Sequence, residues 1–298
     1  MSAVESSLRE IGDLTDAEIF ALTQNIKDEE ASRNPLISPL EPLSTLKTEY
    51  EAGAQAFVRK IESLQQPPHS FAGIRRARGD GNCFYTSTAF AWISGMMNLT
   101  SENRKSVVES ALLDLEKSLN SLKAVGFEPI VYEDFYEVLT DLIRNILYPV
   151  STGTVLNPAS LLQQFQNAET VNSIVIFLRL LISSYIRLHP DDFEPFLFNP
   201  DTGDMVDIKR FCEGWVEAVG READHPQILA LSRALKLPIH IAYLDRSGGD
   251  SGTGKVDLVE FDSVEGETSP ILVTLLYRPG HYDILDKKAE EPAEFLVS

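Results

Sequence analysis

The sequence predicts an α+β fold in which a helical part packs on a small, mostly antiparallel sheet. From residue 43 to residue 235, apolar residues recur mainly at helical intervals. After Pro238 the pattern changes to short apolar or alternating runs, separated by a Gly/Ser-rich loop and an acidic loop, which is typical of strands. With 298 residues and 43% hydrophobic content, the chain is long and apolar enough to bury a substantial core.

The helical part follows a proline-rich segment, residues 34–42, which is expected to be extended. Its helices are expected at residues 43–64, from 84 to at least 93, and at 101–124, 132–148, 161–165, 171–188, 207–219 and 224–235. Asp224 and Gln227 form a capping box that begins the last helix. The helix at 171–188 contains serine and arginine, and we interpret it as a core helix rather than a membrane span.

The strands follow Pro238 and are all short. They are expected at residues 239–244, 256–261, 271–277 and 281–285. The Gly/Ser-rich loop at residues 246–254 and the acidic loop at residues 262–270 separate the first three. These four strands form the expected sheet.

One stretch, residues 75–90 (RRARGDGNCFYTSTAF), places an exposed-looking thiol where a loop becomes a helix. Gly79 and Gly81 bracket Asp80, and glycines allow backbone N–H groups to turn toward a bound group. Cys83 follows at or near a helix N-terminus, where unpaired N–H groups and the helix dipole favour a thiolate. A lone cysteine is more often a buried core residue, so this spacing alone leaves both interpretations open.

A second stretch, residues 277–286 (YRPGHYDILD), supplies a partner for that thiol. Its Pro-Gly turn is followed by a strand with His281 and Asp283 on one face, because strand side chains two residues apart point the same way. His281 can take the proton of the Cys83 thiol, while Asp283 holds the imidazole ring and favours its protonated form. The sequence therefore predicts a cysteine nucleophile, a histidine general acid/base and an orienting aspartate.

These two motifs resemble those of the ovarian-tumour (OTU) cysteine proteases, and specifically the otubains. The resemblance is carried by GNCFY at residues 81–85 and RPGHYDIL at residues 278–285, and further otubain-like sequences stand in order between them. They are YEDF at 132–135, LRLL at 178–181, FC at 211–212, DH at 224–225 and YLDR at 243–246. The resemblance covers about residues 34 to 286. One departure is Gly79, where otubains usually have proline, so the loop before Cys83 is expected to be softer.

The resemblance implies a papain-like OTU cysteine protease fold and a deubiquitinase, a thiol enzyme that hydrolyses the isopeptide bond in ubiquitin chains or conjugates. Cys83 is the expected nucleophile, His281 the general acid/base and Asp283 the residue that orients His281. Asp80 is expected to shape the active-site loop, whose backbone N–H groups would hold the oxyanion together with that of Cys83. Ubiquitin and polyubiquitin are the implied partners, with a preference for the linkage that signals proteasomal degradation.

Two other functions remain open at this point. The first is a non-catalytic protein that keeps the fold but acts by occupying a ubiquitin-conjugating enzyme, which the otubain resemblance also allows. The second is a general peptidase that uses the same three residues. Capture of a ubiquitin-derived electrophile at Cys83 distinguishes the enzyme from the first, because capture needs a reactive thiolate. Cleavage of unfolded casein-like substrates identifies the second.

The chain is expected to form a single catalytic domain, residues 34–286. A prior of roughly 150 residues per domain suggests two domains instead. However, Cys83 and His281 lie far apart in the sequence and can meet only if both halves share one globule.

The two ends of the chain are expected to lie outside this domain. Residues 287–298 form a C-terminal tail, and residues 1–33 form a polar N-terminal arm. Thr15 and Glu18 in the arm resemble a capping box, which predicts a short helix. In otubains the corresponding arm can contact a proximal ubiquitin or a ubiquitin-conjugating enzyme.

The charge and the cysteine content narrow the remaining classes. The formal net charge of −19 argues against a nucleic-acid partner, and the arginines at 75, 76 and 78 are expected to be a solvated approach to the active-site loop. Two cysteines make no disulfide framework, and no metal-ligand spacing such as a paired C-x-x-C is present, so no metal or other cofactor is expected. Cys212 is expected to be an inert, buried thiol.

The sequence also suggests a compartment. No basic region followed by an apolar run begins the chain, and no stretch is expected to reach the length of a membrane span. We therefore expect no membrane partner, and a protein of the reducing cytoplasm with the nucleus as a second location.

Overall fold

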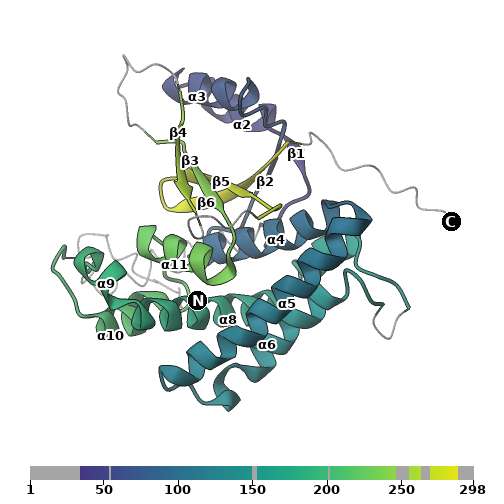
Figure 1. Ribbon diagram of the computed structural model, residues 1–298. Helices are drawn as coiled ribbons and strands as arrows, with labels where there is room; N and C mark the ends of the chain where they lie inside the picture. Colours follow the sequence, from purple (N-terminus) through teal and green to yellow (C-terminus); the bar gives the residue numbers. More distant parts are fainter. Residues whose placement is uncertain are drawn as a thin grey trace, which may run out of the picture.

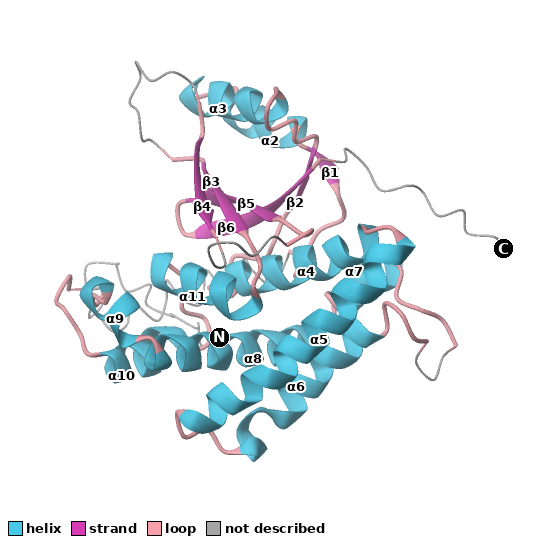
Figure 2. Cartoon of the chain, in the orientation of Figure 1, coloured by secondary structure: helices cyan, strands magenta, loops and turns pink. Residues whose placement is uncertain are grey.

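The computed structural model describes residues 34–53, 55–149, 153–200, 202–245, 255–262 and 269–287. In these residues helices lie on both faces of one sheet, as Figures 1 and 2 show. The predicted α+β class is therefore confirmed. The N-terminal arm, the C-terminal tail after residue 287 and most of the two predicted loops lie outside the described residues.

The sheet has six strands among the described residues. Their bounds are β1 Glu41–Pro42, β2 Gly73–Arg75, β3 Ile239–Tyr243, β4 Asp257–Phe261, β5 Val273–Arg278 and β6 His281–Asp286. They lie in the order β1, β2, β6, β5, β3, β4, and neighbours pair antiparallel except β3 and β5, which are parallel. The predicted small, mostly antiparallel sheet is confirmed, with the short strands β1 and β2 in addition to the four predicted.

The pairing of β2 with β6 brings the two predicted catalytic stretches side by side. Arg75 of β2 lies opposite Ile284 of β6, and the chain then continues from β2 to Cys83. β6 also pairs with β5, so neighbours flank it on both edges. Side chains on such a strand are held more precisely than side chains on a loop, and His281 and Asp283 are presented from this support.

The helices enclose this sheet. Their bounds are α2 Ser44–Tyr50, α3 Gln55–Gln65, α4 Cys83–Asn98, α5 Ser101–Ala124, α6 Pro129–Arg144, α7 Pro158–Gln164, α8 Ala168–Leu188, α9 Pro190–Phe193, α10 Ile208–Phe211 and α11 His225–Leu235. A 3-10 turn at Glu194–Phe196 follows α9, and a π-helical turn at Cys212–Val216 follows α10. The capping box predicted at Asp224 and Gln227 begins α11 and is confirmed.

Two hydrophobic cores lie on the two faces of the sheet. α2 and α3 cover one face of the sheet, as Figure 1 shows. In the core on this face, Leu46, Ile61 and Leu64 of these helices pack with Leu276 of β5 and Leu285 of β6. The larger core, on the other face, contains residues of α4, α5, α6, α8 and α11. β6, the strand that carries His281 and Asp283, therefore lies in a sheet that is packed on both faces.

The helix predicted at residues 43–64 is wrong in one respect, because it is two helices. α2 ends at Tyr50, residues 51–53 form a turn, and α3 begins at Gln55. The N–H of Gly53 donates to the carbonyl oxygen of Tyr50 at 3.2 Å, which closes the turn. Glycine is among the weakest helix formers, which favours a break in the helix at this position. The apolar periodicity continues across the break and therefore did not reveal it.

α8 is the helix on which much of the larger core assembles, since it contacts α4, α5, α6 and α11. By length and composition it is long and apolar enough to cross a membrane, so the expectation that no stretch reaches that length is wrong. However, 67% of its most apolar window is buried inside the protein. This burial agrees with the interpretation of α8 as the core helix of a globular domain.

Candidate active site

The thiol of Cys83 belongs to the first residue of α4, as predicted. The preceding residue, Asn82, occupies the N-cap position without capping the helix through its side chain. The first N–H groups of a helix have no intrahelical acceptor, and together with the helix dipole they favour negative charge on the sulfur. The expectation of an exposed thiol is wrong, because Cys83 is only 2% exposed.

His281 and Asp283 lie on one face of β6, as the strand pleat predicts, and they contact each other. His281 Nε2 and Asp283 Oδ1 are 2.9 Å apart. The carboxylate is fully buried, yet Oδ1 also accepts the N–H of Ala77 at 3.0 Å, and Oδ2 accepts from Arg278 at 2.5 Å. One carboxylate thus binds the imidazole ring, the last residue of β5 and the backbone that leads to Cys83.

The surroundings of this pair favour its charged form. Burial by itself raises the pKa of Asp283, but the hydrogen bond with His281 and the charge of Arg278 outweigh burial and hold the pKa below its ordinary value. Burial likewise lowers the pKa of His281, but the bond with Asp283 and the nearby Cys83 thiol raise that pKa to about 9. At neutral pH the ring is therefore protonated, which is the form that supports a thiolate.

The second ring nitrogen of His281 is the one that can serve the thiol. Nδ1 is buried and makes no hydrogen bond with the part of the chain that the structure describes. A Cβ on Gly79 would lie 3.6 Å from Nδ1, so the loop before Cys83 covers this nitrogen. Because Asp283 occupies Nε2, Nδ1 is the nitrogen available to exchange a proton with Cys83. Such contacts are often long in ligand-free sites and tighten when substrate binds.

Asp80 shapes the loop before Cys83 through hydrogen bonds of its own. Its carboxylate accepts the N–H of Asn82 at 2.8 Å, and its N–H donates to the carbonyl oxygen of Arg78 at 3.0 Å. Burial raises the pKa of Asp80, while the bond from Asn82 and the charge of Arg78 oppose the rise. Two of the donors expected in the oxyanion hole are thus occupied within the loop. The N–H of Cys83 lies in the first turn of α4, where no intrahelical acceptor competes for it.

The loop packs directly on the segment before α11. Gly81 and Gly220 both have positive φ angles, of 75° and 79°. A Cβ on Gly81 would collide with the carbonyl oxygen of Gly220, so only glycine fits this position. The side-chain oxygen of Asn82 accepts the N–H of Gly220 at 3.0 Å. The backbone next to Cys83 is therefore held by close contact with a second segment.

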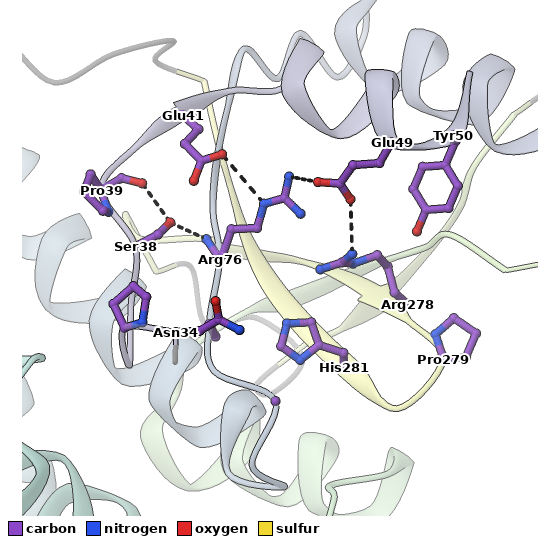
Figure 3. Close-up of a pocket in the computed structure, with 13 residues that line it drawn as sticks. Asn34, Ser38, Pro39, Glu41, Glu49, Tyr50, Arg76, Arg278, Pro279 and His281 are labelled. Carbon is purple, nitrogen blue, oxygen red and sulfur yellow. Dashed lines mark hydrogen bonds and ion pairs between the residues drawn. The ribbon is translucent and has the colours of Figure 1, made fainter. Parts of the chain in front are cut away.

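An open cleft of about 850 Å³ lies beside His281. Figure 3 shows the imidazole ring at its lower edge and α2 across from it. Ion pairs cross the wall of the cleft: Arg76 pairs with Glu49 at 2.5 Å, and Glu49 pairs with Arg278 at 3.8 Å. Since Arg278 also binds Asp283, this wall is joined to the proposed catalytic residues by a continuous row of charges.

The prediction of a solvated arginine approach is wrong for Arg75. Its side chain is buried in β2, donates to the carbonyl oxygen of Ser38 at 3.1 Å, and lies with its guanidinium 5.0 Å from the ring centre of Phe90. An arginine can be buried when its donors are satisfied and its face is stacked. Arg75 therefore helps to fix the strand that leads to the nucleophile.

Sequence reasoning missed three charged residues of this arrangement. Arg278 and Arg179 stand in the quoted motifs, but neither had a role. An arginine within the apolar run at the centre of α8 was a signal that could have identified Arg179, because such a charge needs partners. Glu49 had no signal of this kind, because glutamate on a surface helix is common.

The second thiol behaves as expected. Cys212 is buried, its Sγ lies 3.9 Å from the carbonyl oxygen of Ser183, and burial raises the pKa of the thiol. In the described ranges, no group of three or more His, Cys, Asp or Glu side chains is placed to hold a metal ion.

Comparison with known proteins then places this chain. A family model described as Peptidase C65 Otubain matches residues 29–287. The chain belongs to the otubain family. This otubain is 36% identical over 271 residues to the ovarian tumor domain-containing deubiquitinating enzyme 1 of Arabidopsis thaliana, covering 89% of this chain and 85% of that one. It is 35% identical over 272 residues to the ubiquitin thioesterase OTUB1 of Homo sapiens, covering 91% and 90%.

Solved structures agree with this assignment. This otubain resembles the chain of h/ceOTUB1 in a complex with ubiquitin aldehyde and UBC13~Ub, with a TM-score of 0.74 and 28% identity. The likeness covers 92% of this chain and 98% of that one. The OTU fold implied by the sequence motifs is therefore confirmed.

Replacing Asp283 with asparagine in this otubain is expected to lower the pKa of His281 from about 9 toward its ordinary value of 6.5. The amide keeps the size of the side chain but removes the negative charge that favours the imidazolium. An NMR titration of the His281 ring protons measures the change. Asp224→Asn is the matched control, because Asp224 lies 3.0 Å from a different histidine, His225, and should leave His281 unaffected. An unchanged His281 titration in Asp283→Asn would contradict the pairing.

The same pair makes the stability of the fold depend on pH. The pKa of His281 is raised above 6.5 in the folded protein. The stability that protonation of His281 contributes is therefore fully present below pH 6.5 and is lost as the pH rises through about 9, which chemical denaturation across this pH range measures. In Asp283→Asn this part of the pH dependence should disappear.

Proposed function

We propose that this protein is a cysteine-type deubiquitinase, which hydrolyses isopeptide bonds between ubiquitin and its conjugates. The observation that carries the proposal is the 2.9 Å contact between His281 and a fully buried Asp283, in a site whose cysteine begins α4. Membership of the otubain family supports the substrate class, as do relatives named ubiquitin thioesterase and deubiquitinating enzyme.

In the first half of the reaction, the Cys83 thiolate attacks the carbonyl carbon of the isopeptide bond. The tetrahedral intermediate collapses as the C–N bond breaks, and His281 Nδ1 transfers its proton to the departing lysine amine. The product is a thioester between Cys83 and the C-terminus of ubiquitin. Asp283 occupies Nε2 and orients the ring, so that Nδ1 is the nitrogen that moves the proton.

In the second half, a water molecule attacks the thioester while the now neutral His281 accepts a water proton. The C–S bond breaks, ubiquitin leaves as the free acid, which ionises by releasing the second water proton to solvent, and the thiolate and imidazolium are restored. The N–H of Cys83 stabilises the oxyanion in both halves, together with the Asp80 loop once its internal hydrogen bonds open. Removing one donor of this kind typically costs about 3 kcal/mol of transition-state stabilisation.

The surface of the molecule fits a protein substrate. Phe196 and Met205 are 66% and 64% exposed, and Phe198 pairs with Met205 across a short loop. Large apolar side chains that gather on the surface of a soluble protein mark contacts with other proteins. The net charge of −19 also suits a partner with a basic recognition surface, such as ubiquitin.

Cys83→Ser is expected to lower the turnover of a ubiquitin conjugate by on the order of 10³-fold or more, because the serine hydroxyl does not ionise near neutral pH. Ubiquitin binding should persist, since only one atom changes. A ubiquitin with a C-terminal electrophile should label the wild-type protein covalently and leave Cys83→Ser unlabelled. The matched control is Cys212→Ser, at the buried thiol, which should be labelled as the wild type is.

Two results would overturn this proposal. One is labelling at Cys212 in place of Cys83. The other is hydrolysis of unfolded casein at rates comparable with those for ubiquitin conjugates, which would indicate a general peptidase.

A second mode, the inhibition of a ubiquitin-conjugating enzyme by binding, is favoured by one observation. The solved relatives include OTUB1 in complexes with ubiquitin aldehyde and UBC13~Ub or UBCH5B~Ub. We propose that this chain also binds such an enzyme, with residues 1–33 as part of the contact. Cys83→Ser should then still slow chain formation by UBC13, and deletion of residues 1–33 should remove the effect. If Cys83→Ser leaves chain formation unchanged, the protein acts by hydrolysis alone.

We also propose a preference for the ubiquitin linkage that signals proteasomal degradation. The resemblance to otubains supports it. The cleft beside His281 supports a docking place for the acceptor ubiquitin, because the leaving amine receives its proton from this residue. A panel of differently linked di-ubiquitins measures the preference, and equal hydrolysis of all linkages would contradict it.

A further inference from the structure

Arg179, in the middle of α8, is a buried cation whose hydrogen-bond acceptors are all neutral. The residue is 1% exposed. Its guanidinium donates to the hydroxyl of Tyr85 at 3.2 Å, to the carbonyl oxygens of Val216 at 2.9 Å, Gly81 at 3.1 Å and Arg221 at 2.8 Å, and to the side-chain oxygen of Asn82 at 2.8 Å. The guanidinium also lies 4.0 Å from the ring centre of Tyr85.

Among the described residues, this cation has no direct carboxylate partner, which a fully buried charge generally needs. No carboxylate of the described residues forms an ion pair with Arg179, whereas Arg187, on the same helix, pairs with Glu217 at 2.6 Å. Burial opposes the charge and lowers the pKa of Arg179, while Asp80 and Cys83 act in the opposite direction. A buried charge is costly unless nearby groups compensate it, and these two are the anionic candidates.

The contacts of Arg179 join α8 to two segments near Cys83. Gly81 and Asn82 belong to the loop that leads into α4, whereas Val216 and Arg221 belong to the segment before α11. Asn82 is the N-cap of α4, so the arginine holds the residue immediately before Cys83. Removing its fork of donors would free the loop from the helix behind it.

Two of the groups that interact with Cys83 carry a positive charge that would stabilise a thiolate. His281 and Tyr282 act on it from β6, Tyr85 acts from α4, and Arg179 acts from α8. Burial raises the pKa of both tyrosines, so their phenols stay neutral at neutral pH. His281 and Arg179 therefore carry the positive charge in this group.

We propose that Arg179 is a positioning residue that holds the nucleophile loop through Gly81 and Asn82 and supplies a second positive charge to the Cys83 thiolate. The inference rests on the proposed role of Cys83 as nucleophile. His281 changes its protonation state twice in each turnover, but an arginine does not. A positive charge therefore stays near the sulfur throughout the reaction, including the step in which the thiolate is released from the thioester.

Two substitutions separate charge from geometry. Arg179→Lys keeps a positive charge but loses the planar fork of donors, whereas Arg179→Gln keeps an amide donor without the charge. The thiolate is measured from the pH dependence of alkylation by iodoacetamide in a Cys212→Ser background, where Cys83 is the remaining cysteine. In Arg179→Gln we expect alkylation of Cys83 to slow at a given acidic or neutral pH, because less thiolate forms once the positive charge is removed. In Arg179→Lys the midpoint should stay near that of the parent, while kcat for a ubiquitin conjugate falls.

Arg187→Gln is the matched control. Arg187 lies about two turns along α8, and its charge acts on Cys212 rather than on Cys83, so this substitution should leave the profile unchanged. Identical profiles for Arg179→Gln and Arg179→Lys would overturn the charge role, and an unchanged kcat in Arg179→Lys would overturn the positioning role.

Arg179→Lys alone still tests the proposal if Arg179→Gln does not fold. A midpoint displaced in Arg179→Lys by a full pH unit would contradict the charge role. Alkylation needs no ubiquitin, so its outcome is independent of the substrate class. A Cys83 that does not react with the ubiquitin electrophile would instead count against Cys83 as the nucleophile.

Discussion

The buried carboxylate of Asp283 is the constraint on which the rest of the site depends. Water cannot reach it, so its charge must be balanced by groups of the protein. His281 lies two residues along the same strand, Arg278 ends the neighbouring strand, and the N–H of Ala77 belongs to the segment that leads to Cys83. Because all three must reach one carboxylate, the sheet, the histidine and the nucleophile segment are held in a single relative position.

The nucleophile side of the site is held by a different kind of contact. Gly81 and Gly220 pack backbone against backbone, and Arg179 binds the carbonyl oxygens on both sides of that contact. The cysteine therefore comes from a helix fixed by close packing, and the histidine from a sheet fixed by ion pairs. The proposed hydrolysis of an amide bond would benefit from this division, since an attacking atom and a proton donor must keep their distance while the substrate changes shape.

Ion pairs also connect the site to its surroundings. Glu49, on α2, binds Arg278 and Arg76. Because Arg278 also binds Asp283, which contacts His281, α2 is linked to His281 through a chain of ion pairs. The cleft beside His281 is bounded by this same row of charges. A partner that binds in the cleft would therefore contact groups that are coupled to His281 and Asp283.

Local patterns were enough to predict the start of α4 at Cys83, the shared face of His281 and Asp283, and the capping box of α11, because each depends on residues a few positions apart. They were not enough for β1 and β2, which have two and three residues and exist only through their partners. The burial of Cys83 and Arg75 was also missed, since exposure depends on what packs above a residue. The break near Gly53 was missed because the apolar periodicity continues across it.

Motifs and periodicities are properties of neighbouring residues, so the amino-acid sequence was sufficient to predict the fold class, the family and the three residue types of the proposed chemistry. Only the folded structure shows that Nδ1 of His281 has no hydrogen-bond partner among the described residues, how Asp283 keeps its charge, and that Arg179 binds the residue before Cys83. The bond from Ala77 to Asp283 and the bonds that Arg179 makes join residues 206, 97 and 42 positions apart, and only the folded chain brings such groups together.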